Sequence, residues 1–130
     1  MDKRKIAFFI DDDPDFLELI KEAVQHPNFE IKTLHVDNGY HAIDEIIKTG
    51  PDVLFIDFYL PRINGSQILP VIQYIEAFSD LPVYFITGFS KEKIAPFINQ
   101  NSHYSGVLTK SNHLREEILQ ILENVDKLAA

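Results

Sequence analysis

The sequence predicts an open α/β fold in which five parallel strands alternate with helices that cover both faces of one sheet. Short apolar runs with strand character alternate with segments whose apolar residues share one helical face, and Pro, Gly, Asn or Asp marks nearly every changeover. The chain has 130 residues, 45% of them hydrophobic and 25% charged, which suits one compact domain. Right-handed crossovers between parallel strands then give three layers.

Five runs rich in β-branched and aromatic residues are the expected strands. They cover residues 5–10, 30–36, 53–56, 83–87 and 106–109. The second run is the most polar and suits the edge of a sheet, whereas the first and third look buried on both faces. This distribution favours the strand order 2-1-3-4-5.

Helices are expected between and after these strands, because their apolar residues recur on one face. Asp13 and Pro14 have the pattern of an N-cap and a first helical residue. Ser111 is placed to cap the last helix, and Glu116 and Glu117 lie near its positive end. The expected buried stripes are Phe16, Leu17, Ile20 and Val24; Ala42, Ile43, Ile46 and Ile47; Ile68, Leu69, Ile72 and Ile75; Ile94, Ala95, Phe97 and Ile98; and Leu114, Ile118, Ile121, Leu122, Val125 and Leu128.

Composition and charge exclude several classes of function. Twenty acidic and twelve basic side chains give a formal net charge of -8, so the surface as a whole repels nucleic-acid phosphates and anionic lipid. There is no cysteine for a disulfide or a thiolate metal site, and no secretory or membrane-spanning segment. We therefore expect a single domain over residues 1–130 in the cytoplasm, with no direct binding to nucleic acid or membrane.

Polar residues follow four of the five expected strands, where the functional crevice of an open α/β sheet lies. Asp11, Asp12 and Asp13 follow the first strand and Asp57 the third; Thr87 ends the fourth and Lys110 follows the fifth. Carboxylates gathered at one rim repel one another by about 4 kcal/mol per pair at 4 Å and an effective dielectric near 20. Such a cluster favours a divalent cation, and oxygen ligands favour Mg²⁺ or Mn²⁺.

Each of these residues alone is more simply explained as a helix cap, a turn residue or a surface charge. Together they offer a cation site, a nucleophilic carboxylate and two donors for anionic oxygens, which suits phosphoryl transfer to a carboxylate.

With these residues in place, the sequence resembles the receiver domain of two-component response regulators over about residues 5–128. The resemblance rests on the acidic residues at 11–13, the segment 51–65 around Asp57, the segment 82–88 and Lys110. Pro61 and Gly65, four and eight residues after Asp57, are specific features of that family. The resemblance implies a flavodoxin-like (βα)5 fold.

The resemblance also implies a role for each site residue. Asp57 would accept the phosphoryl group, and Thr87 and Lys110 would bind its oxygens. Asp12, Asp57 and the Tyr59 backbone carbonyl would hold Mg²⁺, with Asp11 acting mainly through water. Gly88 fits the compact residue that gives access to the acceptor. The donor would be a sensor histidine kinase or a histidine phosphotransfer protein, and the product an aspartyl phosphate of a two-component phosphorelay.

Two positions depart from the family pattern. Ser111 stands where Pro usually follows the Lys, often through a cis peptide bond, and a non-proline cis bond costs about 3 kcal/mol. Val107 stands where the family usually has an aromatic switch residue, so switching by a ring at that position is excluded; Tyr104 is the candidate substitute. The resemblance implies a partner or homodimer surface on the fourth helix, fifth strand and fifth helix, with Phe97 and Tyr104 as apolar contacts.

Tyr59 and Phe89 lie two residues after Asp57 and Thr87, at positions that flank the path of water to an acyl phosphate. Neither carries an amide or carboxylate that orients water, and two rings exclude it. The hypothesis is a slowly decaying phosphoryl state; the alternative is that both rings lie outside the pocket.

Two other functions compete with this interpretation. The first is a docking module that no longer takes phosphate, suggested by Val107 and Ser111. The second is a haloacid-dehalogenase-type phosphatase, suggested by the Asp-x-Asp pattern of residues 11–13, although Asp15 stands where that resemblance wants Thr or Val. We expect a signalling module that assists its own phosphorylation and dephosphorylation, not an enzyme with an external substrate.

Overall fold

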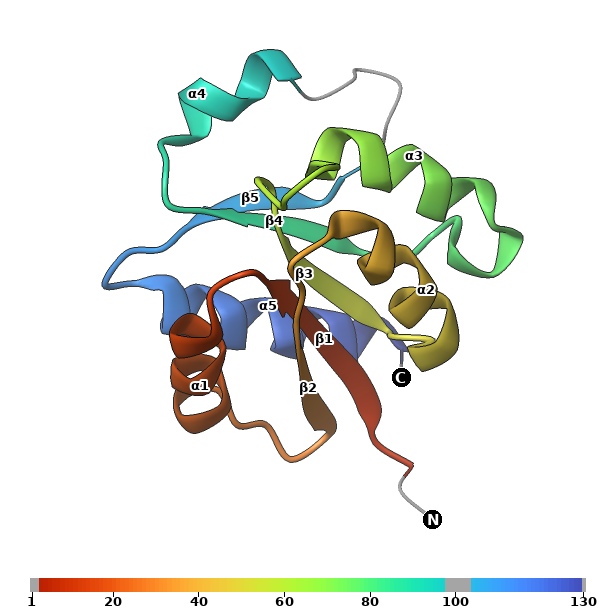
Figure 1. Cartoon of the computed structure of the whole chain (residues 1–130). Helices are drawn as coiled ribbons and strands as arrows, with labels where there is room; N and C mark the ends of the chain where they lie inside the picture. The colour runs from red at the N-terminus through yellow and green to blue at the C-terminus, as the bar shows by residue number, and fades with distance from the viewer. Residues whose placement is uncertain (1–2, 98–103, 130) are drawn as a thin grey trace.

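The computed structural model describes residues 3–97 and 104–129 and contains one five-stranded parallel sheet with the order β2-β1-β3-β4-β5 (Figure 1). This order and the layered α/β architecture confirm the predicted fold. The strands are β1 Lys5–Asp11, β2 Phe29–His35, β3 Val53–Asp57, β4 Val83–Thr87 and β5 Gly106–Thr109. The helices are α1 Pro14–Ala23, α2 Gly39–Thr49, α3 Gly65–Tyr74, α4 Lys91–Ile94 and α5 Leu114–Ala129, with short 3-10 segments η1 Glu76–Phe78 and η2 Ala95–Phe97.

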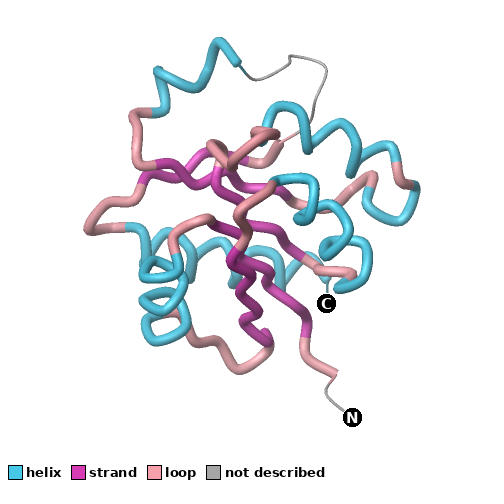
Figure 2. Tube along the Cα trace, in the orientation of Figure 1, coloured by secondary structure: helices cyan, strands magenta, loops and turns pink. Residues whose placement is uncertain are grey.

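The sheet separates two apolar clusters (Figures 1 and 2). Side chains of β1 and β3 alternate between them: Phe8 and Leu54 face the helices α2, α3 and α4, whereas Phe9 and Phe55 face α1 and α5. The rings of Phe9 and Phe55 stack with their centroids 4.5 Å apart. Both central strands are buried throughout their middle, as the sequence predicts.

Local caps fix where the helices begin. Asp13 and Pro14 occupy the predicted N-cap and N1 positions of α1, and the Asp13 side chain accepts a hydrogen bond from the Asp15 amide. Asn64 caps α3 and forms a capping box with Gln67. These caps start α1 and α3 directly above the carboxyl ends of β1 and β3.

Some predicted boundaries are wrong. The stripe of Ile94, Ala95, Phe97 and Ile98 predicts a longer fourth helix, but α4 ends at Ile94 and η2 follows. Pro96 explains the break, because its ring removes an amide donor and clashes with the preceding turn. Ile98 and the Phe97 side chain lie outside the described part of the chain.

The last helix begins at Leu114, so Ser111 lies three residues ahead of it and is not its N-cap. The Ser111 hydroxyl instead accepts a hydrogen bond from the His113 amide at 3.4 Å, within the turn that leads into the helix. Glu116 and Glu117 occupy the first turn as predicted. The second strand runs one residue earlier than predicted, and the amide of Val36 still bonds to the Asp11 carbonyl.

A cluster of polar side chains, here called the N-terminal clasp, joins the start of β1 to α5 and consists of Lys5, His26, Asn28, Glu123 and Asp126. Asp126 contacts Lys5 Nζ and Asn28 Nδ2, both at 2.9 Å. His26 Nε2 lies 2.6 Å from Glu123 Oε1, and its Nδ1 accepts from the Asn28 amide. The clasp lies at the amino end of β1, away from the residues that end the strands.

Within residues 3–97 and 104–129, no helix combines the length and the apolar character that crossing a membrane requires.

Candidate functional site

Three carboxylates meet where β1 and β3 end. Asp11, Asp12 and Asp57 each offer an oxygen within 4.8 Å of the other two. Asp11 and Asp57 are buried and Asp12 is exposed. Parallel pairing of β1 with β3 aligns Ile10 with Ile56, so the acids that follow fall at one level of the rim. The predicted acidic cluster is therefore present.

Lys110 is the cation of this cluster. Its Nζ lies 2.9 Å from Asp11 Oδ2 and 3.7 Å from Asp57 Oδ2. The Lys110 amide bonds to the Thr87 carbonyl, which fixes the chain after β5 against the end of β4. On the other side, Lys110 Nζ lies 4.3 Å from the centroid of the Phe16 ring. The lysine thus bridges two buried acids above an aromatic ring.

Backbone amides hold the two buried acids in place. The Asp13 amide donates to Asp11 Oδ1 at 2.9 Å, and the Tyr59 amide donates to Asp57 Oδ1 at 3.0 Å. Asp11 Oδ2 has the Lys110 ammonium within ion-pair distance, but no described donor meets it with hydrogen-bond angles. Lys110 is therefore the charged partner of this buried oxygen, and its contact is ionic.

Burial and mutual repulsion shift the acids toward their protonated forms. Burial, together with the negative charges of Asp11 and Asp12, raises the pKa of Asp57 to about 7, against the opposing effects of the Tyr59 amide and Lys110. Burial also raises the pKa of Asp11, although Lys110 and the Asp13 amide oppose that rise. One ammonium does not neutralise the cluster.

Thr87 is fully buried at the end of β4, and its Oγ1 accepts a hydrogen bond from the Phe89 amide at 3.0 Å. The register pairs Asp57 with Ile86, so Thr87 lies one residue further along the neighbouring strand. A Cβ built on the following Gly88 would meet no atom within 4 Å. Thr87 thus ends the strand next to that of Asp57, and the open space lies at Gly88, the residue after it.

Tyr59 and Phe89, which follow Asp57 and Thr87 by two residues, contact each other through their rings. The rings of Tyr59 and Phe89 meet edge to face with centroids 5.2 Å apart, and Tyr59 also meets Phe58. Lys93 of α4 places its Nζ 5.6 Å from the Phe89 centroid. Both rings are partly exposed, 39% for Tyr59 and 51% for Phe89. The sequence predicts aromatic residues at these two positions, but it does not predict the contact between their rings.

The two positions that depart from the family pattern, Val107 and Ser111, lie in β5 and just after it. The peptide bonds of the described residues, including that between Lys110 and Ser111, are trans, and Lys110 still contacts both acids. Val107 pairs with Phe85 and packs partly buried in the core. The Tyr104 ring lies 5.8 Å from the Phe85 ring and is 40% exposed. Tyr104, which precedes β5, therefore brings an aromatic side chain against Phe85.

Comparison with known proteins defines the class. The model of the response regulator receiver domain matches residues 7–123, so the chain belongs to the response regulator receiver family. The chain is 32% identical to the transcriptional regulatory protein TrcR of Mycobacterium tuberculosis over 82 residues, which are 63% of this chain and 30% of TrcR. It is 22% identical to the polar-differentiation response regulator DivK of Brucella anthropi over 86 residues, 66% of this chain and 68% of DivK. The chain thus spans only about a third of TrcR.

Solved structures share the fold at low sequence identity. The chemotaxis response regulator CheY4 of Vibrio cholerae superimposes with a TM-score of 0.77 at 18% identity, covering 95% of this chain and 99% of CheY4. The receiver domain of the sensor histidine kinase PA1611 from Pseudomonas aeruginosa, which holds a magnesium ion in its active-site cleft, gives 0.77 at 17% identity and covers 93% of this chain and 96% of that domain. Five parallel strands in this order with flanking helices are the flavodoxin-like fold of receiver domains, which are signalling modules that interact with histidine kinases or phosphotransfer proteins.

The contact between Phe16 and Lys110 is also absent from the sequence-based expectations. Phe16 is expected only as part of a buried helical stripe, yet it supports the Lys110 ammonium. Its position two residues after Pro14, in the first turn of a helix that starts at the rim, is the signal that indicates this contact.

Proposed function

We propose that this receiver domain accepts a phosphoryl group on Asp57 from a phosphohistidine of a sensor kinase or phosphotransfer protein. The observation that carries the proposal is the placement of Lys110 between two buried acids, 2.9 Å from Asp11 and 3.7 Å from Asp57. A carboxylate held in this way by the Tyr59 amide is a positioned nucleophile.

In the proposed step, an Asp57 carboxylate oxygen attacks the phosphorus of the phosphohistidine. The P–O bond forms as the P–N bond breaks, and the electron pair returns to the imidazole nitrogen, which takes a proton from solvent. The Lys110 ammonium and the Thr87 hydroxyl stabilise the negative charge on the equatorial oxygens. Hydrolysis of the acyl phosphate by water later restores Asp57 and releases inorganic phosphate.

The acidic cluster fits Mg²⁺, with Mn²⁺ as a substitute. The donors are all oxygens, and three carboxylates face a single ammonium. Asp12, Asp57 and the Tyr59 carbonyl would hold the ion, with Asp11 acting mainly through water. A bound Mg²⁺ neutralises phosphoryl oxygens and lets several carboxylates stay ionised together.

The output of the switch is a change of surface that a partner protein recognises. We place that surface on α4, β5 and α5, where the exposed Tyr104 contacts Phe85, the residue that pairs with Val107 in the sheet register. The same surface is the candidate homodimer interface. We propose that the domain is a single unit over residues 1–130, works in the cytoplasm and binds neither nucleic acid nor membrane directly.

The test is the intact mass of the protein after incubation with Mg²⁺ and acetyl phosphate. We expect one phosphoryl adduct, and we expect it to be absent from an Asp57→Asn variant and from a sample with EDTA. Histidine-phosphorylated kinases and phosphotransfer proteins serve as the second class of donor.

One observation favours a second function, a phosphate-independent docking module. Val107 and Ser111 occupy the two positions where the sequence departs from the family pattern, and both lie next to the proposed output surface. If neither acetyl phosphate nor the histidine-phosphorylated donors give an adduct, this second function replaces the first.

A further inference from the structure

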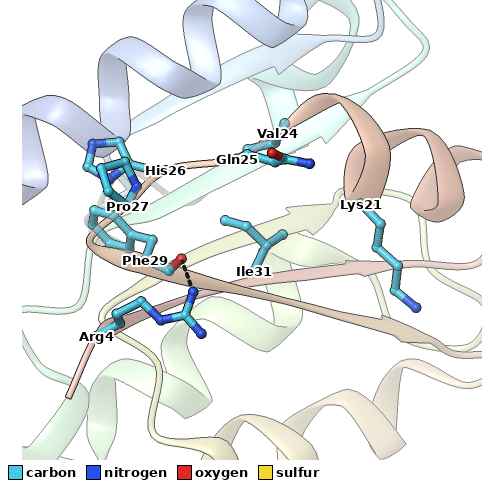
Figure 3. Close-up of a pocket in the computed structure, with 8 residues that line it drawn as sticks. All are labelled: Arg4, Lys21, Val24, Gln25, His26, Pro27, Phe29 and Ile31. Carbon is cyan, nitrogen blue, oxygen red and sulfur yellow. Dashed lines mark hydrogen bonds between the residues drawn. The ribbon is translucent and has the colours of Figure 1, made fainter. Parts of the chain in front are cut away.

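The edge of the sheet that β2 forms is bordered by a continuous groove, here called the β2 groove, around Arg4, Lys21, Ile31 and Lys32. A hollow of about 450 Å³ has Ile31 at its floor, with Arg4 before β1 and Lys21 of α1 at its two ends (Figure 3). A second hollow of about 360 Å³ shares Lys21 and Ile31 and extends to Lys32. A third of about 300 Å³ shares Arg4 and extends to Lys3 and Lys5.

The β2 groove is basic in a chain that is acidic overall. Five of the twelve Lys and Arg residues line it, and Glu45 is the one acid among the described lining residues. Lys5 is paired with Asp126, and the exposed Lys21 lies 3.8 Å from Glu18. Arg4 donates to the Phe29 carbonyl at the start of β2. Against a net charge of -8, this is a local concentration of positive charge.

The strand beside the groove also has unused pairing capacity. Among the described strands, β2 pairs with β1 alone, and it lies between α1 on one face of the sheet and α2 on the other (Figure 1). An edge strand presents a row of backbone donors and acceptors to an incoming chain. Ile31 and Leu34 are only partly buried, on opposite faces of the sheet, so apolar surface borders the edge on both sides.

We propose that the β2 groove docks an extended acidic segment of a partner protein, which adds to the sheet as a strand beside β2. Main-chain hydrogen bonds to the edge would supply affinity, while acidic side chains meet the exposed Lys21 and Lys32. A second copy of this chain is disfavoured, because its own basic groove would face the first. Nucleic acid is disfavoured by the charge of the rest of the surface. This site is separate from the phosphoacceptor and does not depend on it.

The probe is a fluorescent ten-residue peptide in which pairs of Val alternate with pairs of Glu, so that both faces of the added strand carry acids. It is titrated with the intact protein and followed by fluorescence anisotropy. Three peptides test the recognition: the acidic one, one with Lys in place of Glu, and an acidic one with N-methyl groups on alternate residues. We expect only the first to bind, with amide NMR shifts confined to β2 and the residues of the β2 groove. An Asp57→Asn variant should bind equally, which separates this result from the proposed function.

The protein variants are matched by charge and exposure. Reversing both exposed lysines, Lys21→Glu with Lys32→Glu, should weaken binding about tenfold, and the Gln pair should weaken it less. Lys93→Glu, an exposed lysine on α4 beside the other edge, should leave binding unchanged.

Three results overturn the proposal: no binding of the acidic peptide, equal binding of the N-methylated peptide, or tighter binding of a duplex DNA of similar length. The first would mean that the lysines only protect the edge from pairing.

Discussion

At the scale of single residues, the site is defined by a charge imbalance. Two buried carboxylates and one exposed carboxylate face a single ammonium, which lies 2.9 Å from Asp11 Oδ2. Folding therefore brings like charges together at a cost that packing elsewhere has to offset.

This cost predicts how stability depends on pH when no divalent cation is present. The pKa of Asp57 rises from 3.8 in the unfolded chain to about 7 in the folded one, so the folded state binds the proton more tightly. The resulting stabilisation is complete below about pH 4 and is lost as the pH rises through about 7, by up to about 4 kcal/mol. Urea unfolding in EDTA should show this fall between about pH 4 and pH 7 and little further change at pH 8.

Asp57→Asn should remove most of that pH dependence and stabilise the protein at pH 8, since it deletes one of the repelling charges. Asp44→Asn, on the exposed face of α2, is the control and should leave the dependence intact. An Asp57→Asn protein with the same slope as the wild type would contradict this account.

The ring of Tyr59 predicts the lifetime of the phosphorylated state. Replacing Tyr59 by Asn opens the edge-to-face contact with Phe89 and adds an amide able to orient water, so the phosphoryl adduct should decay several-fold faster. The decay is followed by intact mass after the donor is removed. Tyr59→Phe, which keeps the ring, should decay slowly, and Tyr40→Asn on α2 should change nothing. Equal lifetimes for Tyr59→Asn and the wild type would mean that the rings do not limit access.

The positions of the site residues could be predicted because each one ends a strand of a parallel sheet. Asp57, Thr87 and Lys110 come from three such ends, and the strand order brings them together. Two contacts could not be predicted: that of Phe16 with Lys110 and that of Tyr59 with Phe89. A sequence pattern does not give the direction in which a side chain leaves its backbone.

At the scale of elements, α3 is held close to the sheet by a glycine. A Cβ built on Gly65 would lie 2.5 Å from the Phe85 ring and 3.0 Å from the Phe58 ring, and the Gly65 amide bonds to the Phe58 carbonyl. The spacing of Gly65 from Asp57 thus has a packing reason in this chain, namely the close approach of a helix start to two aromatic rings.

Gly65→Ala should destabilise the fold by about 1–3 kcal/mol, because the rings have to move away from the added methyl group. Gly88→Ala is the matched control, since its Cβ would meet no atom within 4 Å. Urea midpoints of the two variants measure the difference. Similar midpoints would mean that the aromatic rings rearrange at no cost.

The elements differ in how well the sequence predicts them. Strand order and the caps of α1 follow from local patterns and are confirmed. The predicted fourth helix is too long, because the apolar spacing continues past Pro96 whereas the helix ends at Ile94. Ser111 has the chemistry of a cap but lies too early, since the turn through His113 sets where α5 begins.

At the scale of the whole molecule, the acidic cluster should link cation binding to global stability. Mg²⁺ should raise the melting temperature, with a gain of about 2.7 kcal/mol at a concentration one hundred times its Kd. Asp12→Asn should reduce the gain, because it removes the exposed ligand of the cluster. Differential scanning calorimetry at constant ionic strength tests this, and an equal rise with Na⁺ alone would contradict it.

The N-terminal clasp carries a consequence for how the protein is made. Lys5 and Asp126 are 121 positions apart in the chain, yet their side chains meet. A ribosome delivers β1, a central strand, well before the ionic partner of Lys5 on α5. The ion pair that joins the two ends of the fold therefore forms only after α5 has left the exit tunnel.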